Sequence, residues 1–188
     1  MDKIELRHQL RSRITALSDE QRVAKSRSAY HNLIKTDEYK KASVVMIYLP
    51  LPHEIDTTAV ILHAWQNEKT IAVPKVSWQQ RHMIPVEINS LEVGFSTEKG
   101  GLKNPITGVP MPFEDIDLVV TPGLGFDRQG NRLGKGGSYY DRFFGSKHLD
   151  AKKCGYAFSE QIIDSVPVEE HDVPVDFIVT NEGVIECD

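Results

Sequence analysis

Apolar residues recur every three or four positions in the first third of the chain, which is the spacing of an amphipathic helix. One such stripe is formed by Leu6, Leu10, Ile14 and Leu17. Ser18, with Gln21 three residues later, has the pattern of a capping box that opens a helix. The sequence therefore predicts a helix up to about residue 17 and a second helix over residues 19–34. We expect the buried face of the second helix to consist of Val23, Tyr30, Leu33 and Ile34.

Short apolar runs dominate the rest of the chain, and such runs are typical of strands covered on both faces. They are residues 43–50, 70–74, 82–88, 117–122, 154–158, 177–180 and 183–186. Pro85 has no backbone N–H to donate, so we expect the third of these strands at a sheet edge. Residues 56–67 predict a helix whose inward face is Val60, Ile61, Ala64 and Trp65. Residues 94–112 are rich in Gly and Pro and predict a loop.

Strands that alternate with helices predict an α/β fold, with a mainly parallel sheet flanked by helices. The chain has 188 residues, of which 40% are apolar and 26% are charged. These values are those of an ordinary globular protein and exclude global disorder. A chain of this length can bury a sizeable core, so we expect residues 1–188 to form a single domain.

Several features bear on location and on partners. The longest apolar stretch, residues 44–49, is too short to cross a bilayer, and the first 20 residues lack the apolar block of a signal peptide. Cys154 and Cys187 form no CxxC motif and fit a reducing compartment. The net charge of −5 argues against a broad nucleic-acid surface. We therefore expect a cytoplasmic monomer that acts on small molecules and binds neither nucleic acid nor membrane.

The segment with the clearest chemistry is PGLGFDRQGNRLGKGGSYYDRFF, residues 122–144, which holds six of the 13 glycines. It follows a predicted strand and precedes a predicted helix (139–144), which is where ligands bind in open α/β folds. Glycine lets backbone N–H groups approach an anion closely, and a helix N-terminus adds unpaired donors. Arg132 and Lys135 supply positive charge, and Asp141 offers oxygen ligands to a divalent cation.

Two familiar phosphate motifs do not match this segment. GNRLGKG has three residues between its first two glycines, where a Walker A loop needs four, and Gly136 stands where Ser or Thr is required. Gly123 and Gly125 are followed by Arg128, so a dinucleotide fingerprint is also excluded. The residues alone thus support a phosphate loop, and a glycine-rich turn with solvated charges remains the alternative.

The whole segment resembles the signature of the 5-formyltetrahydrofolate cyclo-ligase family. In that family Pro-Gly-x-x-Phe-Asp leads into Gly-x-Arg-Leu-Gly, a glycine-rich turn and Tyr-Tyr-Asp-Arg. Three distant features agree with the resemblance: KIELR (3–7), LPLPHEIDT (49–57) with Glu54, and HDVPVDFIVT (171–180) with Asp176. The resemblance therefore extends over essentially the whole chain.

The resemblance implies an enzyme that uses ATP and Mg²⁺ to close 5-formyltetrahydrofolate into 5,10-methenyltetrahydrofolate, with release of ADP and phosphate. It implies that Arg7, Arg132 and Lys135 stabilise charge on the phosphoryl group as it moves. The ATP-binding residues that it implies are Lys3, Ile4, Glu5, Leu6, Arg7, Arg132, Leu133, Gly134, Lys135, Gly136, Gly137, Ser138, Tyr139 and Tyr140.

The resemblance also implies a folate site and a metal site. Glu54 would accept N–H bonds from the pterin. The other folate-binding residues would be Leu49, Lys135, Gly136, Gly137, Ser138 and Tyr139. Asp141 and Asp176 match the magnesium carboxylates. Trp78 is expected to be a partly exposed loop residue rather than a wall of the folate site.

Ser138 departs from the family pattern, in which this position is glycine. If the backbone there needs a positive φ, Ser adds strain of about 1 kcal/mol. If φ is negative, Ser138 could cap the following helix.

Three other interpretations remain. A related protein that binds nucleotide or folate with lost or altered activity has Ser138 as its only support. A sugar-phosphate isomerase or CoA transferase on a similar fold would need a catalytic carboxylate but no ATP. A non-enzymatic interaction module would leave the glycine-rich segment unexplained.

Overall fold

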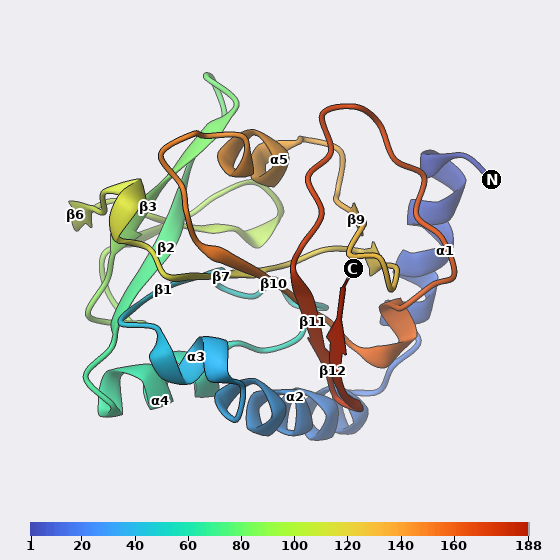
Figure 1. Ribbon diagram of the computed structural model, residues 1–188, viewed down its shortest axis with the longest axis horizontal. Helices are drawn as coiled ribbons and strands as arrows, with labels where there is room; N and C mark the ends of the chain where they lie inside the picture. The colour runs from blue at the N-terminus through green and yellow to red at the C-terminus, as the bar shows by residue number, and fades with distance from the viewer. Residues whose placement is uncertain (188) are drawn as a thin grey trace.

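The computed structural model describes residues 1–187 and is built around one eight-stranded sheet (Figure 1). The strand order is β12-β11-β10-β7-β1-β2-β3-β6. Their bounds are β1 Val44–Ile47, β2 Thr70–Ser77, β3 His82–Glu87, β6 Val109–Pro110, β7 Leu118–Thr121, β10 Lys152–Tyr156, β11 Phe177–Thr180 and β12 Gly183–Glu186. The central strands β2, β1, β7, β10 and β11 run parallel, and β3, β6 and β12 pair antiparallel at the two ends. The predicted α/β class with a mainly parallel sheet is confirmed.

Helices cover both faces of this sheet. In Figure 1, α2 (Asp19–Ile34), α3 (Asp37–Lys41) and α4 (Thr58–Gln66) lie on one face, and α5 (Tyr139–Phe144) lies on the other. Because side chains alternate along a strand, Val45 and Ile47 enter the core under α2 and α4, whereas Met46 packs on the side of Phe143 and Phe144. The sheet is therefore buried on both faces, as the continuous apolar runs predict.

The N-terminal helices form where the sequence predicts them. α1 (Lys3–Thr15) is capped by Asp2, whose side chain accepts from the N–H of Glu5 at 2.8 Å. Ser18 and Gln21 form both bonds of the capping box that opens α2. Leu10 and Ile14 of α1 are buried against the segment that follows β7, so α1 is fixed beside the glycine-rich region.

The predicted buried face of α2 is partly wrong. Val23 is 62% exposed, and the residues that are fully enclosed are Ser26, Ala29 and Leu33. Small side chains at Ser26 and Ala29 let the helix approach β11 closely, and such residues carry little hydrophobic signal. The short helix α3 was not predicted.

Residues 94–112 are more ordered than the predicted loop. They contain β4 (Phe95–Thr97), paired with β5 (Lys103–Pro105), the short 3-10 helix η1 (Lys99–Gly101) and β6. Asn104 docks this hairpin on β2, because its amide both accepts from the N–H of Val76 and donates to the carbonyl of Val76, each at 2.8 Å. The hairpin is thereby fixed next to the carboxyl edge of the sheet.

Pro85 does not place β3 at the edge, as the sequence predicted, because the two-residue β6 lies outside it. Pro85 faces Pro74 of β2, but its carbonyl accepts from the N–H of Met111 on the opposite side of β3, so the missing N–H of Pro85 points away from β2. Among residues 1–187, none of the helices combines the length and the apolar character that a membrane crossing requires.

Candidate active site

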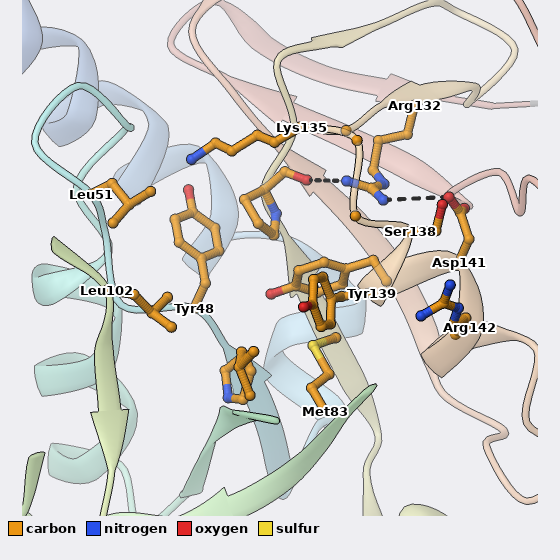
Figure 2. A pocket seen from close by; sticks show the side chains of 18 of the residues that line it. Tyr48, Leu51, Met83, Leu102, Arg132, Lys135, Ser138, Tyr139, Asp141 and Arg142 are labelled. Atoms are coloured by element: carbon orange, nitrogen blue, oxygen red, sulfur yellow. Dashed lines mark hydrogen bonds and ion pairs between the residues drawn. The ribbon is translucent and has the colours of Figure 1, made fainter. Parts of the chain in front are cut away.

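A cavity of about 1100 Å³ lies at the carboxyl ends of β1 and β7, the edge at which open α/β folds bind ligands. Tyr48 and Leu49 follow β1, and Pro122 and Gly123 follow β7. Figure 2 shows Lys135 and Ser138 on the glycine-rich loop above the cavity, and Tyr139 and Met83 at its floor. Other parts of the wall come from α1, from β2 and β3 with the turn between them, from the segment 99–103, from the loop 134–138 with α5, and from the segment 169–172.

Arg132, from the short strand β9 (Arg132–Leu133), is a buried cation at this site. Its side chain is only 5% exposed and donates to the carbonyl of Pro122 at 3.0 Å. A second guanidinium nitrogen lies 3.8 Å from a carboxylate oxygen of Asp141 (Figure 2), and the group stacks 5.2 Å from the centre of the Tyr140 ring. Burial lowers the pKa of Arg132, and the charge of Asp141 opposes this shift. The Nε–H has no hydrogen-bond partner among the described residues.

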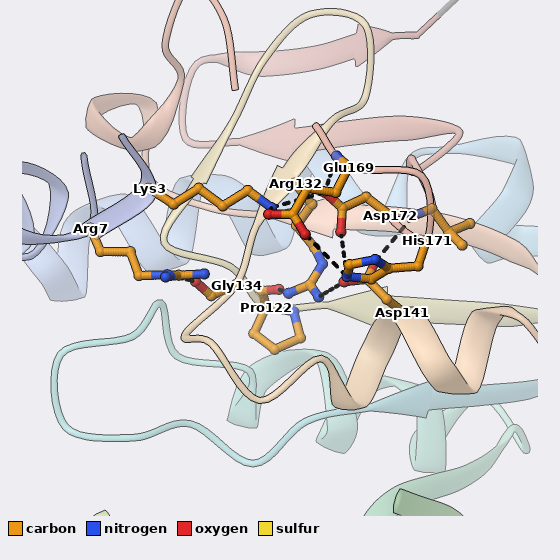
Figure 3. Close-up of polar contacts among 10 residues, drawn as sticks. Lys3, Arg7, Pro122, Arg132, Gly134, Asp141, Glu169, His171 and Asp172 are labelled. Carbon is orange, nitrogen blue, oxygen red and sulfur yellow. Dashed lines mark hydrogen bonds and ion pairs between the residues drawn. The ribbon is translucent and has the colours of Figure 1, made fainter. Parts of the chain in front are cut away.

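Arg7 ties α1 to the glycine-rich loop. Its Nε donates to the carbonyl of Gly134 at 2.9 Å, and Figure 3 shows this contact across the mouth of the cavity. Gly136 has a φ of +112°, and a Cβ added there would lie 3.9 Å from the Arg7 guanidinium carbon. The loop thus bends under the arginine in a backbone conformation that only glycine adopts readily.

Ser138 has a positive φ, with φ 58° and ψ 23°, and its side chain makes no capping bond to α5. Of the two possibilities that the sequence left open, the strained backbone is therefore the one observed. The neighbouring Gly137 has an ordinary negative φ and does not take over the left-handed position.

Lys3 is held by two acidic residues of the segment 169–172 at the rim of the cavity (Figure 3). Its ammonium group lies 3.0 Å from Asp172 and 3.2 Å from Glu169. Burial pulls the pKa of Lys3 down, but the bonds to Asp172 and Glu169 outweigh it and leave this pKa raised. At Asp172, burial acts to raise the pKa, but the hydrogen bonds from the Glu169 N–H and from Lys3 outweigh it and leave this pKa lowered. The chain thereby keeps a charged pair at the cavity rim.

Glu54 and Lys135 face each other across the opposite part of the cavity. The Lys135 ammonium lies 3.4 Å from one Glu54 oxygen, and the other oxygen accepts from the N–H of Leu51 at 2.8 Å. Trp78 and Tyr139 meet edge to face with ring centres 6.0 Å apart. Trp78 is 41% exposed, as expected for a loop residue, but it also lines the cavity, which the sequence prediction set aside.

Most of the predicted site residues meet in this cavity. Its wall includes Lys3, Arg7, Leu49, Glu54, Arg132, Gly134, Lys135, Gly136, Gly137, Ser138, Tyr139, Tyr140 and Asp141. Ile4 is instead 76% exposed, and Leu6 and Leu133 pack in the cluster between α1 and β9. Glu5 is exposed at the first turn of α1. These four residues are not part of the cavity wall.

The structure does not bring Asp176 to Asp141. Asp176 lies just before β11, at the amino edge of the sheet, where its carboxylate accepts from the N–H of Lys153 at 2.8 Å. Asp172, four residues earlier, lines the cavity, and the next N–H, that of Val173, donates to Asp141 at 3.1 Å. The carboxylate that accompanies Asp141 is therefore Asp172, and the predicted partner Asp176 caps a strand instead.

Other wall residues were not predicted, namely Arg11, Arg81, Lys99, Lys103, Glu169 and Asp172. Arg11 follows Lys3 and Arg7 at helical spacing, which is a signal that the sequence contains. Lys99 and Lys103 reach the site only because Asn104 docks their hairpin on β2.

A cavity at the carboxyl edge of a parallel sheet, with a glycine-rich loop, several cations and aromatic walls, defines a class of α/β enzymes that bind phosphorylated ligands. The family model of the 5-formyltetrahydrofolate cyclo-ligase family matches residues 1–181. The chain belongs to this family and is accordingly an enzyme of the ligase class.

Individual relatives agree with this assignment. The chain is 31% identical to the 5-formyltetrahydrofolate cyclo-ligase of Mus musculus over 95% of this chain and 93% of the relative. It is 28% identical to the 5-formyltetrahydrofolate cyclo-ligase of Escherichia coli over 94% of this chain and 99% of the relative. The structure of 5,10-methenyltetrahydrofolate synthetase from Aquifex aeolicus superimposes with a TM-score of 0.84 at 34% identity, covering 99% of this chain and 93% of the other.

Proposed function

We propose that this protein uses ATP and Mg²⁺ to close 5-formyltetrahydrofolate to 5,10-methenyltetrahydrofolate, with release of ADP and phosphate. The N5-formyl group is amide-like, and its oxygen is a poor leaving group. Transfer of the γ-phosphoryl group from ATP to this oxygen makes it a good one. N10 then forms a bond to the formyl carbon and loses its proton, and the carbon–oxygen bond breaks as phosphate departs. No covalent intermediate with the enzyme is needed, so the protein's work is to position both substrates and to stabilise charge.

The cations of the site support the phosphoryl-transfer role. Lys3, Arg7, Arg132 and Lys135 come from three different elements and reach one cavity. Arg132 is held in place by Pro122 and Asp141 and retains an Nε–H without a partner among residues 1–187. A cation that is already fixed loses little freedom when the negative charge of the transition state develops. This convergence is the observation that carries the proposal.

The other part of the cavity has the chemistry of a pterin site. Glu54 is fixed by the N–H of Leu51 and offers carboxylate oxygens to the N–H groups of an aminopyrimidine. Tyr139, Leu49 and Trp78 supply apolar and aromatic surface for a flat ring and for the aromatic group attached to it.

The donor set fits Mg²⁺ when phosphate is present. Mg²⁺ binds one or two carboxylates and completes its octahedron with water and phosphate oxygens. Asp141 and Asp172 both line the cavity, and the N–H of Val173, the residue after Asp172, donates to the Asp141 carboxylate at 3.1 Å. Within residues 1–187 there is no group of three or more His, Cys, Asp or Glu side chains arranged to hold a metal. We therefore assign Mg²⁺ to Asp141 and Asp172, where it would offset the charge of the ATP phosphates.

The test is the absorbance of methenyltetrahydrofolate, followed with purified protein, Mg²⁺ and 5-formyltetrahydrofolate, with and without ATP. Growth of the band that requires ATP supports the proposal. Growth without ATP would indicate an isomerase-like or acid-catalysed closure. No growth, with protein shown to be folded and to bind ATP, would indicate a relative with altered activity.

We propose further that the enzyme acts as a monomer in the cytoplasm. The whole cavity wall comes from a single chain. Cys154 is a fully buried core residue that forms no disulfide, as expected for a protein of a reducing compartment. Light scattering during gel filtration tests the monomer directly, and a dimer mass at assay concentrations would overturn it.

A further inference from the structure

Glu98 lies outside the cavity wall, yet its carboxylate bonds to a side chain of that wall. The residue belongs to the β4–β5 hairpin and comes directly before η1. One carboxylate oxygen accepts from the Trp78 indole N–H at 2.7 Å and from the Asn104 amide at 3.1 Å. The other oxygen accepts from the Ser96 hydroxyl. The carboxylate therefore joins the hairpin to the turn between β2 and β3, which carries Trp78.

Two of these three bonds fix the carboxylate within its own hairpin. Ser96 of β4 and Asn104 of β5 lie opposite each other in the register of the two strands, and both donate to Glu98. The bonds from Ser96 and Trp78 lower the pKa of Glu98, so the carboxylate keeps its charge at neutral pH. A charged acceptor makes a shorter and stronger hydrogen bond than a neutral one. The hairpin thus presents a fixed, charged acceptor to the Trp78 indole.

The Trp78 ring has little other support, whereas the backbone around it is held independently of Glu98. The indole is 41% exposed, and its ring contact is the edge-to-face one with Tyr139, with centres 6.0 Å apart. The turn itself is held from α5, because the Arg142 guanidinium donates to the carbonyl of Arg81. Loss of the Glu98 carboxylate would therefore free the indole to adopt other rotamers and leave the turn in place.

We propose that Glu98 is a positioning residue for 5-formyltetrahydrofolate, which acts by holding the Trp78 indole against Tyr139 as part of the aromatic wall of the folate site. This inference rests on the proposed function, because it takes the ligand from that reaction. Glu98 does not line the cavity, so its effect reaches the folate only through Trp78. The cations proposed for ATP come from other elements, so binding of ATP and phosphoryl transfer stay as they are.

The test compares Glu98→Ala and Glu98→Gln, with Glu92→Ala as the control. Gln keeps all three bonds without the charge, since its carbonyl oxygen accepts from Trp78 and Asn104 and its amide donates to the Ser96 hydroxyl. Glu92 is an exposed acid of the same segment. We expect Glu98→Ala to raise KM for 5-formyltetrahydrofolate about three- to tenfold, the loss of one hydrogen bond, with kcat and KM for ATP nearly unchanged. Glu98→Gln and Glu92→Ala should behave as the unaltered protein does.

Two further measurements show whether Glu98 acts through Trp78. In Trp78→Phe the N–H is gone, so adding Glu98→Ala to this variant should change KM for 5-formyltetrahydrofolate by less than about twofold. Trp65 is the other tryptophan, so the fluorescence of Trp78 is measured in proteins that carry Trp65→Phe. In these proteins without ligand, Glu98→Ala should lower the fluorescence anisotropy of Trp78, because a released indole moves within nanoseconds.

Several results would overturn the inference. They are an unchanged KM for 5-formyltetrahydrofolate or an unchanged anisotropy in Glu98→Ala, and the same increase in KM when Trp78 is already Phe. An equal loss in Glu98→Gln would assign the effect to charge, and equal increases in both KM values with a lower kcat would indicate a deformed site.

Absence of turnover in the unaltered protein would instead count against the proposed function. Calorimetric titration with 5-formyltetrahydrofolate would then decide on Glu98. The Kd of Glu98→Ala should exceed that of the unaltered protein about three- to tenfold, and that of Glu98→Gln should equal it. Equal Kd values in all three proteins, or no binding by the unaltered protein, would overturn the inference.

Discussion

The left-handed conformation of Ser138 predicts an unusual order of stabilities at this position. A non-glycine residue at φ 58° is disfavoured by about 1 kcal/mol relative to its ordinary backbone conformations. Ser138→Gly removes this strain, but glycine also gains freedom in the unfolded chain, which costs about 0.5–1 kcal/mol. The two effects nearly cancel, so we expect Ser138→Gly to change the free energy of unfolding by no more than about 0.5 kcal/mol.

The other substitutions separate backbone strain from hydroxyl chemistry. The Ser138 side chain makes no capping bond, so Ser138→Ala should also lie within about 0.5 kcal/mol of the unaltered protein. A β-branched residue fits a positive φ poorly, so Ser138→Val should lose about 1–2 kcal/mol. We therefore expect the proteins with Gly, Ser or Ala at position 138 to have similar free energies of unfolding, and the protein with Val to have a clearly lower one.

The assay is urea unfolding followed by circular dichroism, with turnover measured on the same samples. We expect Ser138→Gly to keep kcat within about threefold, since the loop already has the conformation that glycine would adopt. A loss above about 1 kcal/mol in Ser138→Ala would mean that the hydroxyl does cap α5. A Val variant as stable as Ser would mean that φ is negative here. Either result would refute the reasoning from the backbone.

Three further predictions concern the charged groups of the site. Lys135→Ala and Asp141→Ala should each lower kcat at least about tenfold while the circular dichroism spectrum stays that of the folded protein. Near-normal rates in both variants would show that these residues do not take part in the reaction. Because the pKa of Asp172 is lowered in the fold, the stability contributed by its bonds is present above its unfolded pKa and is lost as the pH falls through the folded one. In Asp172→Asn, the free energy of unfolding should therefore fall less steeply below about pH 4. The measurement is urea unfolding at a series of pH values. An unchanged pH dependence would show that the ion pair of Asp172 with Lys3 does not contribute to stability. Removal of Mg²⁺ with EDTA should abolish turnover but leave the melting temperature unchanged. Residues 1–187 provide no three-ligand cluster that would make a metal ion part of the fold. A large drop in the melting temperature would contradict the assignment of Mg²⁺ to Asp141 and Asp172.

Much of the fold could be predicted from local patterns. The capping box at Ser18 and the apolar runs at 44–47 and 118–121 are short-range signals, and each produced the expected helix or strand. Val23 was misplaced because the close approach of α2 depends on the small residues Ser26 and Ala29, which carry no apolar signal. The hairpin around Asn104 was missed for a similar reason, since one amide bonded to Val76 docks it.

The site could be predicted only where its residues lie in one recognisable segment. Arg132 and residues 134–141 lie together along the cavity, and the binding roles that the resemblance implies for them stay predictions. Asp176 lies directly before β11 at the amino edge of the sheet, whereas Asp172 belongs to the preceding segment along the cavity, and two aspartates four residues apart look alike in a sequence.

The most direct test of the central claim follows the formyl oxygen. In the proposed reaction the γ-phosphoryl group is transferred to this oxygen, and phosphate leaves with it when N10 closes the ring. 5-Formyltetrahydrofolate labelled with ¹⁸O in the formyl group should therefore yield phosphate that carries one ¹⁸O for each methenyltetrahydrofolate formed, as measured by mass spectrometry. Unlabelled phosphate, with the ¹⁸O found in water, would show that ATP does not activate the formyl oxygen and would contradict the account.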